Sequence, residues 1–173
     1  HFLMNLTTSY LGLKLENPLV VGASPFCDNT ATARQLQDAG AAAIVMRSLF
    51  EEQIDAEQRA LVYNVESHAE STAEATSFFP GFSEYQLTPD HYLRQIEHLK
   101  ASLTIPVIAS LNGCRPGGWT EYARKFEQSG ADAIELNLYQ LVTDRGVDAE
   151  YIEASMIETV ASVVRSVKIP DRK

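Results

Sequence analysis

Small polar residues recur where four apolar segments of the chain end. Ser24, Ser48, Ser110 and Asn137 each close or follow such a segment, and Arg47 adds a cation. The full set, in chain order, is Gly22, Ala23, Ser24, Cys27 and Asp28; Arg47, Ser48 and Glu51; Ser110, Asn112 and Cys114; and Asn137, Tyr139, Thr143, Asp144 and Arg145. It contains no histidine and no cluster of carboxylates. It therefore suits a flat heterocycle with polar edges, and we expect no metal site.

Predicted strands and helices alternate around these residues. The expected strands cover 16–24, 40–48, 105–113 and 131–138, and the expected helices cover 30–39, 88–103, 119–130 and 149–167. Thr30 and Thr88 are candidate N-caps, while Gly40 and Gly130 are suited to ending helices. The pattern predicts four consecutive βα units.

The units resemble one another, which favours one kind of α/β fold. Residues 40–44 and 130–134 share Gly-Ala-x-Ala-Ile, and Ile-Pro recurs at 105–106 and 169–170. Self-similar βα units, with no GxGxxG after the first strand, favour a TIM (β/α)8-type barrel over a Rossmann sheet. Four units make a half-barrel. We expect either a truncated chain, ending where a fifth strand would start, or a homo-oligomer that covers the open sheet edges.

The segment 131–138 places a carboxylate inside this predicted barrel. Alternation puts Glu135 and Asn137 on one face, with apolar residues toward the helices. Glu135 needs interior partners because burying a charge is costly. It could belong to a structural network or to catalysis, and Asn137, nearer the loop, could meet a ligand. Arg47 is either an anchor for a negative group or a partner of Glu51 or Glu52.

Composition limits the function classes. The 173 residues are 45% hydrophobic and suit one domain, and the net charge of −9 argues against nucleic-acid binding. No segment is long and apolar enough for a membrane helix, so we expect a cytoplasmic protein that binds a small molecule. Two cysteines are too few for a disulfide framework and are interpreted as free thiols. Residues 1–3 precede Met4 and are, on one interpretation, an addition to the native chain.

Four segments together resemble the N-terminal half of the dihydroorotate dehydrogenase family, and more closely its dihydroorotate dehydrogenase-like branch. They are "YLGLKLENPLVVGASP", "GAAAIVMRSLFEEQI", "IPVIASLNG" and "GADAIELNLY". The resemblance spans residues 4–170, with an insertion at 51–87 that is either a lid or a packing and dimer contact. It implies a (β/α)8 barrel that binds flavin mononucleotide (FMN) and oxidises dihydroorotate to orotate in pyrimidine biosynthesis.

The resemblance also implies site residues. Its cofactor-contacting positions fall on Ala23, Ser24, Arg47, Ser48, Ser110, Asn112 and Asn137. Arg47 stands where the family has a lysine, so a planar fork replaces a point charge.

Two departures bear on activity. The family has Ser-Cys-Pro after its Asn and Leu, whereas this chain has Tyr139-Gln140-Leu141, and glutamine cannot act as a general base. Cys114 and Cys27 are the weak substitutes for the catalytic base. The family's fifth-strand lysine and phosphate-binding loops would fall beyond Lys173, so we expect this chain to bind flavin weakly. The alternative function is a non-catalytic half-barrel that self-associates.

Overall fold

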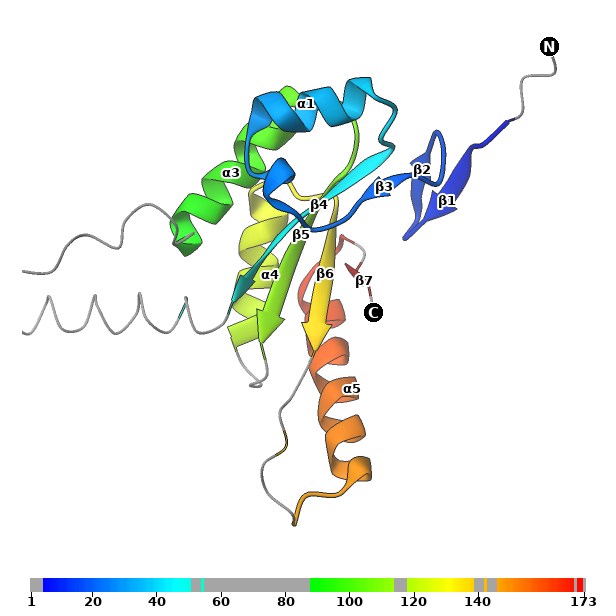
Figure 1. Ribbon diagram of the computed structural model, residues 1–173. Coiled ribbons are helices and arrows are strands. Elements are labelled where there is room, and N and C mark those ends of the chain that lie inside the picture. Colours follow the sequence, from blue (N-terminus) through cyan, green and yellow to red (C-terminus); the bar gives the residue numbers. More distant parts are fainter. Residues whose placement is uncertain are drawn as a thin grey trace, which may run out of the picture.

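The computed structural model describes residues 5–50, 54, 88–113, 118–138, 142, 146–169 and 171–172. Its main feature is a parallel five-stranded sheet in which the strands follow one another in chain order (Figure 1). The strands are β3 (Val20–Val21), β4 (Ala43–Phe50), β5 (Val107–Gly113), β6 (Ala133–Leu138) and β7 (Asp171–Arg172). The helices are α1 (Thr30–Asp38), α3 (Pro89–Ser102), α4 (Gly118–Gln128) and α5 (Ala149–Ser166), with a short 3-10 helix, η1 (Pro25–Cys27).

The helices lie on one face of the sheet. The larger core cluster joins side chains of all four helices to one set of strand residues, among them Ile44, Val107, Ile134 and Leu136. The opposite face, which we call the inner face, carries Val45, Ile108 and Ala133 in a separate cluster. Sequential strand order with helices on one face differs from a doubly wound sheet, which has helices on both. The predicted α/β class and parallel sheet are confirmed. The half-barrel stays a prediction, because the described sheet is open and its curvature into part of a barrel is not established.

Two glycines end helices and start strands in the same way. Gly40 and Gly130 have φ values of 102° and 93°. The amide that follows each glycine bonds a carbonyl five residues back, Ala41 to Leu36 and Ala131 to Phe126, as in a Schellman motif. The repeat predicted from Gly-Ala-x-Ala-Ile is therefore one recurring helix-to-strand turn.

Two local predictions were wrong. The first strand is only Val20–Val21, since the Asn17 side chain accepts a hydrogen bond from the Leu19 amide at 2.9 Å and Pro18 has no amide hydrogen. The N-cap of α1 is Asn29, whose Oδ1 accepts from the amides of Ala31 and Thr32, and Thr30 is the first helical residue. Thr88 does cap α3, as predicted.

A hairpin that the sequence did not predict covers the inner face near the strand starts. It joins β1 (Thr8–Tyr10) to β2 (Leu13–Leu15) through Leu11 and Gly12, both with positive φ. Leu15 is buried against the inner-face cluster, and Tyr10 packs at its margin. The hairpin therefore supplies the apolar contacts that the inner face lacks from helices.

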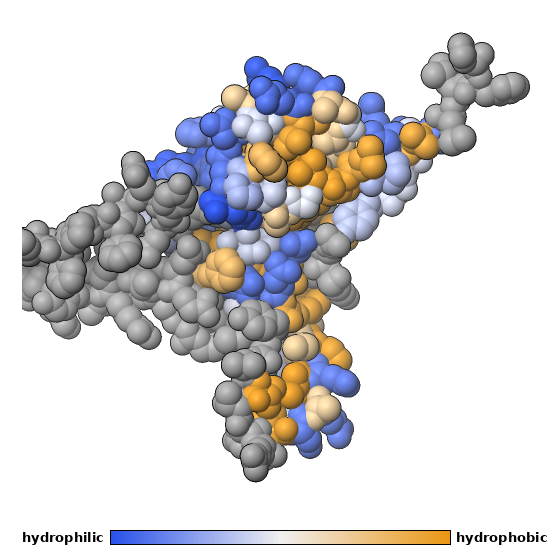
Figure 2. All heavy atoms as spheres, viewed as in Figure 1, coloured by the Kyte–Doolittle hydropathy of each residue, from blue (hydrophilic) through white to orange (hydrophobic). Residues whose placement is uncertain are grey.

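Helix α5 leaves apolar side chains at the surface. Tyr151, Ile157 and Val164 are 64%, 68% and 45% exposed, and hydrophobic atoms gather over this helix (Figure 2). A groove of about 470 Å³ runs along it, lined by Met156, Ile157, Val160, Ala161, Val164 and Arg165. No helix within the described ranges is long and apolar enough to cross a membrane.

Candidate functional site

A β-bulge in β4 arranges the polar residues of the inner face. Val45 pairs with Ile108, but the next paired residue is Ser48, opposite Ser110. Three steps along β4 therefore match two along β5, so the alternation changes phase. Ser48 joins the inner face, and Leu49 returns to the helix-facing core. Strict alternation from Val45 would instead have placed Arg47 on the inner face.

The bulge brings together four polar side chains, Ser48, Ser110, Glu135 and Asn137, which we call the inner polar cluster. Ser110 Oγ donates to Glu135 Oε1 at 3.0 Å and lies 2.8 Å from Ser48 Oγ. Because the Ser110 hydroxyl has one proton, Ser48 is the donor in the second contact. Asn137 Nδ2 donates toward Ser48 Oγ at 3.0 Å, Ser110 Oγ at 3.1 Å and Glu135 Oε1 at 3.3 Å. The interior partners expected for Glu135 are confirmed.

Strand register explains why these side chains meet. Ser110 lies opposite Glu135, and Asn112 lies opposite Asn137, on adjacent parallel strands. Ser110 is fully buried, while Ser48, Glu135 and Asn137 are half-buried. Ser48 and Asn137 lie in the carboxyl halves of β4 and β6, toward the end where α/β folds place their ligands, while Ser110 and Glu135 lie in mid-strand. Asn112, also predicted, is half-buried and lies two residues beyond Ser110 on β5.

Tyr92 of α3 supports the cluster from the helix side. Its hydroxyl donates to the carbonyl of Ser110 at 3.1 Å and accepts from the amide of Ser110 at 2.9 Å. Tyr92 is fully buried, and burial raises the pKa of its hydroxyl well above the ordinary value. The sequence prediction missed this residue, although its type gave a signal, since a buried tyrosine needs a partner for its hydroxyl.

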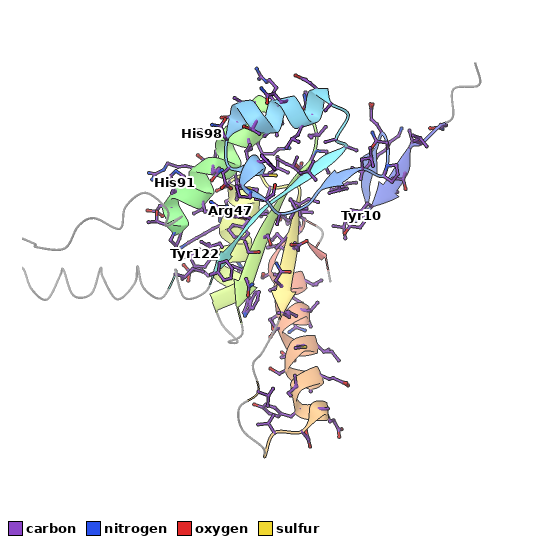
Figure 3. The ribbon with its side chains drawn as sticks, viewed as in Figure 1. Tyr10, Arg47, His91, His98 and Tyr122 are labelled. Carbon is purple, nitrogen blue, oxygen red and sulfur yellow. The ribbon has the colours of Figure 1, made fainter. Side chains whose placement is uncertain are left out.

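Arg47, labelled in Figure 3, forms an ion pair with Asp28 in the turn after η1. Neither sequence alternative named this partner, and Glu51 and Glu52 lie outside the described residues. The Arg47 Nε is buried and has no hydrogen-bond partner in the described part of the chain. The ion pair holds Arg47 beside the loop after β3 and leaves this buried donor for a further contact.

Of the two candidate catalytic thiols, the structure describes Cys27. Cys27 is fully buried, and its sulfur lies 4.0 Å from the Ser24 hydroxyl. Burial is the main reason that the Cys27 pKa is raised, which disfavours the thiolate form that a base requires. Cys114 and the loop with Tyr139, Gln140 and Leu141 lie outside the described residues.

The remaining predicted cofactor residues lie in the loop after β3. Ala23 is exposed, and Ser24 is half-buried and faces the Cys27 sulfur. Both follow β3, whose Val21 pairs with Ile44 of β4, so they lie at the same end of the sheet as the inner polar cluster. The structure brings Ser48, Ser110 and Asn137 into direct contact, but records no such contact for Ala23 or Ser24.

The donor set fits the polar edge of a flavin ring better than a metal. In the described part of the chain, no three metal-binding side chains come together. Ser48, Asn137 and Asn112 offer hydroxyl and amide groups at the strand ends, suited to the imide edge of a heterocycle. Ser48, Asn112 and Asn137 are the residues that would contact FMN, which would serve as the hydride acceptor if bound, whereas Ser110 is fully buried and would act only by positioning Ser48 and Asn137.

Fold and site together define an α/β protein with a singly wound parallel sheet and a polar cluster toward the strand ends. No protein-family model matches the chain. Its curated relatives include the catalytic subunit of dihydroorotate dehydrogenase B (NAD(+)) from Thermoplasma acidophilum, 29% identical over 135 residues, covering 78% of this chain and 41% of the relative. A putative dihydroorotate dehydrogenase A (fumarate) from Aeropyrum pernix is 25% identical and covers 95% of this chain and 51% of the relative.

A second catalytic subunit of dihydroorotate dehydrogenase B, from Thermoplasma volcanium, is 26% identical over 96% of this chain. The predicted resemblance to the N-terminal half of this family is thus confirmed, and the chain spans about half the length of the curated relatives it matches. Among solved structures, a dihydrodipicolinate synthase from Bacillus anthracis covers 88% of this chain and 44% of its own, with 15% identity and a TM-score of 0.51. That likeness supports a TIM-barrel-like α/β fold and nothing more specific.

Proposed function

We propose that this chain is part of a cytoplasmic, FMN-dependent oxidoreductase of the dihydroorotate dehydrogenase type. The observation that carries the proposal is the inner polar cluster, in which Ser48 and Asn137 lie toward the strand ends and are held by Ser110 and Glu135 in mid-strand. The substrate is dihydroorotate or a related small molecule, since the loop at 139–141 differs from the family's base-bearing motif. The names of the curated relatives support this reaction class.

Within this proposal the cluster positions the cofactor. Asn137 is oriented by three neighbouring acceptors, so its amide is held without the entropy cost of ordering it on binding. Ser48 donates to Ser110 and accepts from Asn137, which leaves one lone pair on Ser48 Oγ available to accept from a bound ring. The ion pair with Asp28 keeps Arg47 near the loop that follows β3.

The visible absorption spectrum of the purified chain tests the proposal, before and after addition of FMN and desalting. Flavin fluorescence is titrated in parallel, to detect binding too weak to survive desalting. We expect saturable quenching by FMN. A chain that quenches no FMN fluorescence at any concentration contradicts the proposal. Tight one-to-one binding of FMN by a monomer contradicts only the expectation that this chain binds flavin weakly.

A second candidate is a non-catalytic half-barrel that self-associates. The exposed apolar side chains of α5 favour it, because contiguous apolar surface commonly marks an interaction site. The edges of the described sheet, β3 and β7, could pair with a second copy. A colourless, stable dimer in sedimentation equilibrium supports this candidate, and a monomer that binds FMN contradicts it.

A further inference from the structure

A small cavity of about 120 Å³ lies between the start of α1 and the outer side of α3, away from the inner polar cluster. Its lining includes His91, Arg94 and His98 of α3 and Thr30 of α1. The labelled histidines project from the same helix (Figure 3). Positions three and seven residues apart share a helix face, so the three basic side chains lie on the same side of α3.

This gathering of basic groups is unusual for the chain. The net charge is −9, yet His91 and His98, both of the histidines in the described ranges, line this one cavity together with an arginine. Asp28 also lines the cavity, but its charge is paired with Arg47. The first residue of a nine-residue helix, Thr30, adds the positive end of the α1 dipole. The cavity is therefore suited to an anion.

Gln95 provides an independent indication of a ligand. It is only 6% exposed and lines the cavity, and its Nε2 donates to the carbonyl of Cys27 at 3.4 Å. That bond fixes the amide orientation and leaves Oε1 buried, with no hydrogen-bond partner in the described part of the chain. A buried acceptor without a donor is costly, so a ligand here gains by bringing a hydroxyl hydrogen.

We propose that this cavity binds a protonated phosphate group, either free or as the end of a phosphomonoester. Inorganic phosphate carries a P–OH hydrogen for Gln95 Oε1 at neutral pH, and a phosphomonoester carries one below its second pKa of about 6. Either group has further oxygens for Arg94 and the two histidines. The volume equals that of about four water molecules, enough for one phosphate and too small for a nucleoside. The remainder of a phosphomonoester would lie in solvent. No residue of the inner polar cluster lines this cavity, so the proposal does not depend on the flavin site, although Asp28 in the lining pairs with Arg47.

Sulfate is the decisive comparison, because it matches phosphate in shape but carries no hydrogen at neutral pH. Backbone amide NMR shifts of the full chain are followed during titrations with inorganic phosphate, sulfate and glycerol 2-phosphate at constant ionic strength and about pH 6, where a phosphomonoester still keeps much of its P–OH hydrogen and sulfate has none. We expect phosphate to shift amides around α3 and the start of α1, and to bind about tenfold more tightly than sulfate. Equal affinities for the two anions, or no saturable shift with phosphate, overturn the proposal.

Arg94→Gln should weaken phosphate binding about tenfold, whereas Arg165→Gln, which removes the same charge from exposed α5, should leave it unchanged. Equal effects of the two variants would mean general charge attraction and would overturn the site. The amide spectrum of each variant without ligand is compared with that of the parent, to confirm that the variant is folded. Binding of glycerol 2-phosphate identifies a phosphomonoester site, and binding of inorganic phosphate alone identifies a free-phosphate site, both in accord with the proposal.

Discussion

The hydroxyl of Tyr92 lies 2.9 Å from the amide nitrogen and 3.1 Å from the carbonyl oxygen of Ser110, and so it satisfies both backbone groups of one strand residue. These groups lie beside the bulge that interrupts pairing between β4 and β5. A bulge leaves strand groups unpaired, and an unpaired buried backbone group is costly. Tyr92 thus supports the irregularity that places Ser48 in the inner polar cluster.

Tyr92→Phe should destabilise the fold by about 2 kcal/mol, because two buried backbone groups lose their partner while the ring packing remains. Urea unfolding followed by circular dichroism measures the change. Tyr151→Phe is the matched control, since Tyr151 is 64% exposed, and its effect should be within about 0.5 kcal/mol. Equal stability of the Tyr92 variant and the parent would contradict the structural role of the hydroxyl.

Tyr92 also predicts sensitivity to alkali. Burial raises its pKa in the folded state above the ordinary value of 10.0, so the unfolded chain releases this proton first. The stabilisation is complete below pH 10 and is lost as the pH rises from there toward the folded-state pKa. The stability of the parent should therefore fall toward that of Tyr92→Phe above this pH, by at most about 1.4 kcal/mol per pH unit. A constant difference between the two proteins from pH 8 to about pH 11 would contradict this.

The cap of α1 gives a test between sequence and structure. Asn29→Ala should destabilise the chain by about 1 kcal/mol because Asn29 Oδ1 accepts from two amides of the first turn. Thr30→Ala, at the position that the sequence favoured, should change stability by less than about 0.5 kcal/mol. Chemical unfolding at equal temperature compares the two. A larger loss from the Thr30 variant would restore the sequence-based assignment.

Much of the fold follows from local pattern, and the exceptions have particular causes. Period-two alternation in β6 correctly placed Glu135 and Asn137 on one face, because β6 is regular. The same rule failed in β4, because β4 has a bulge, beside which Tyr92 of α3 bonds the backbone of Ser110. The residues next to Arg47 in the sequence give no indication of the bulge or of the contact between Tyr92 and Ser110.

The hairpin was missed for a different reason. Its turn is Leu11-Gly12, with φ values of 51° and 74°, whereas two-residue turns are normally recognised by Asn-Gly or Asp-Gly. A leucine in this left-handed region is unfavourable alone and is tolerated because Leu11 packs against the inner-face cluster. Tertiary packing therefore decided a turn that local residue preference argued against.

Asp132 stabilises the second of the two repeated turns. Its Oδ2 accepts from the amide of Val107 at 2.7 Å and from Lys100 Nζ at 2.7 Å, and the equivalent position in the first turn is Ala42. Asp132→Ala should therefore fold, because the first turn forms with alanine, but lose about 2 kcal/mol. Asp132→Asn should lose less, since it retains an acceptor for Val107.

Glu121→Gln is the control for charge alone, because the Glu121–Lys125 pair is more exposed. Its effect should be within about 0.5 kcal/mol. Unfolding in denaturant measures all three variants. Similar losses from Glu121→Gln and Asp132→Ala would mean that the buried amide contact contributes nothing.

The inner polar cluster predicts which substitutions weaken flavin binding. Ser48→Ala should reduce the affinity for FMN about tenfold, because it removes the hydroxyl that orders Asn137 and offers an acceptor to the ring. Ser166→Ala is the matched control, since that hydroxyl donates to the carbonyl of Val163 at the end of α5. Fluorescence titration with FMN measures the affinities, and circular dichroism confirms that both variants fold. If Ser48→Ala binds FMN as the parent does, the flavin contacts other residues, and the cluster serves the sheet alone.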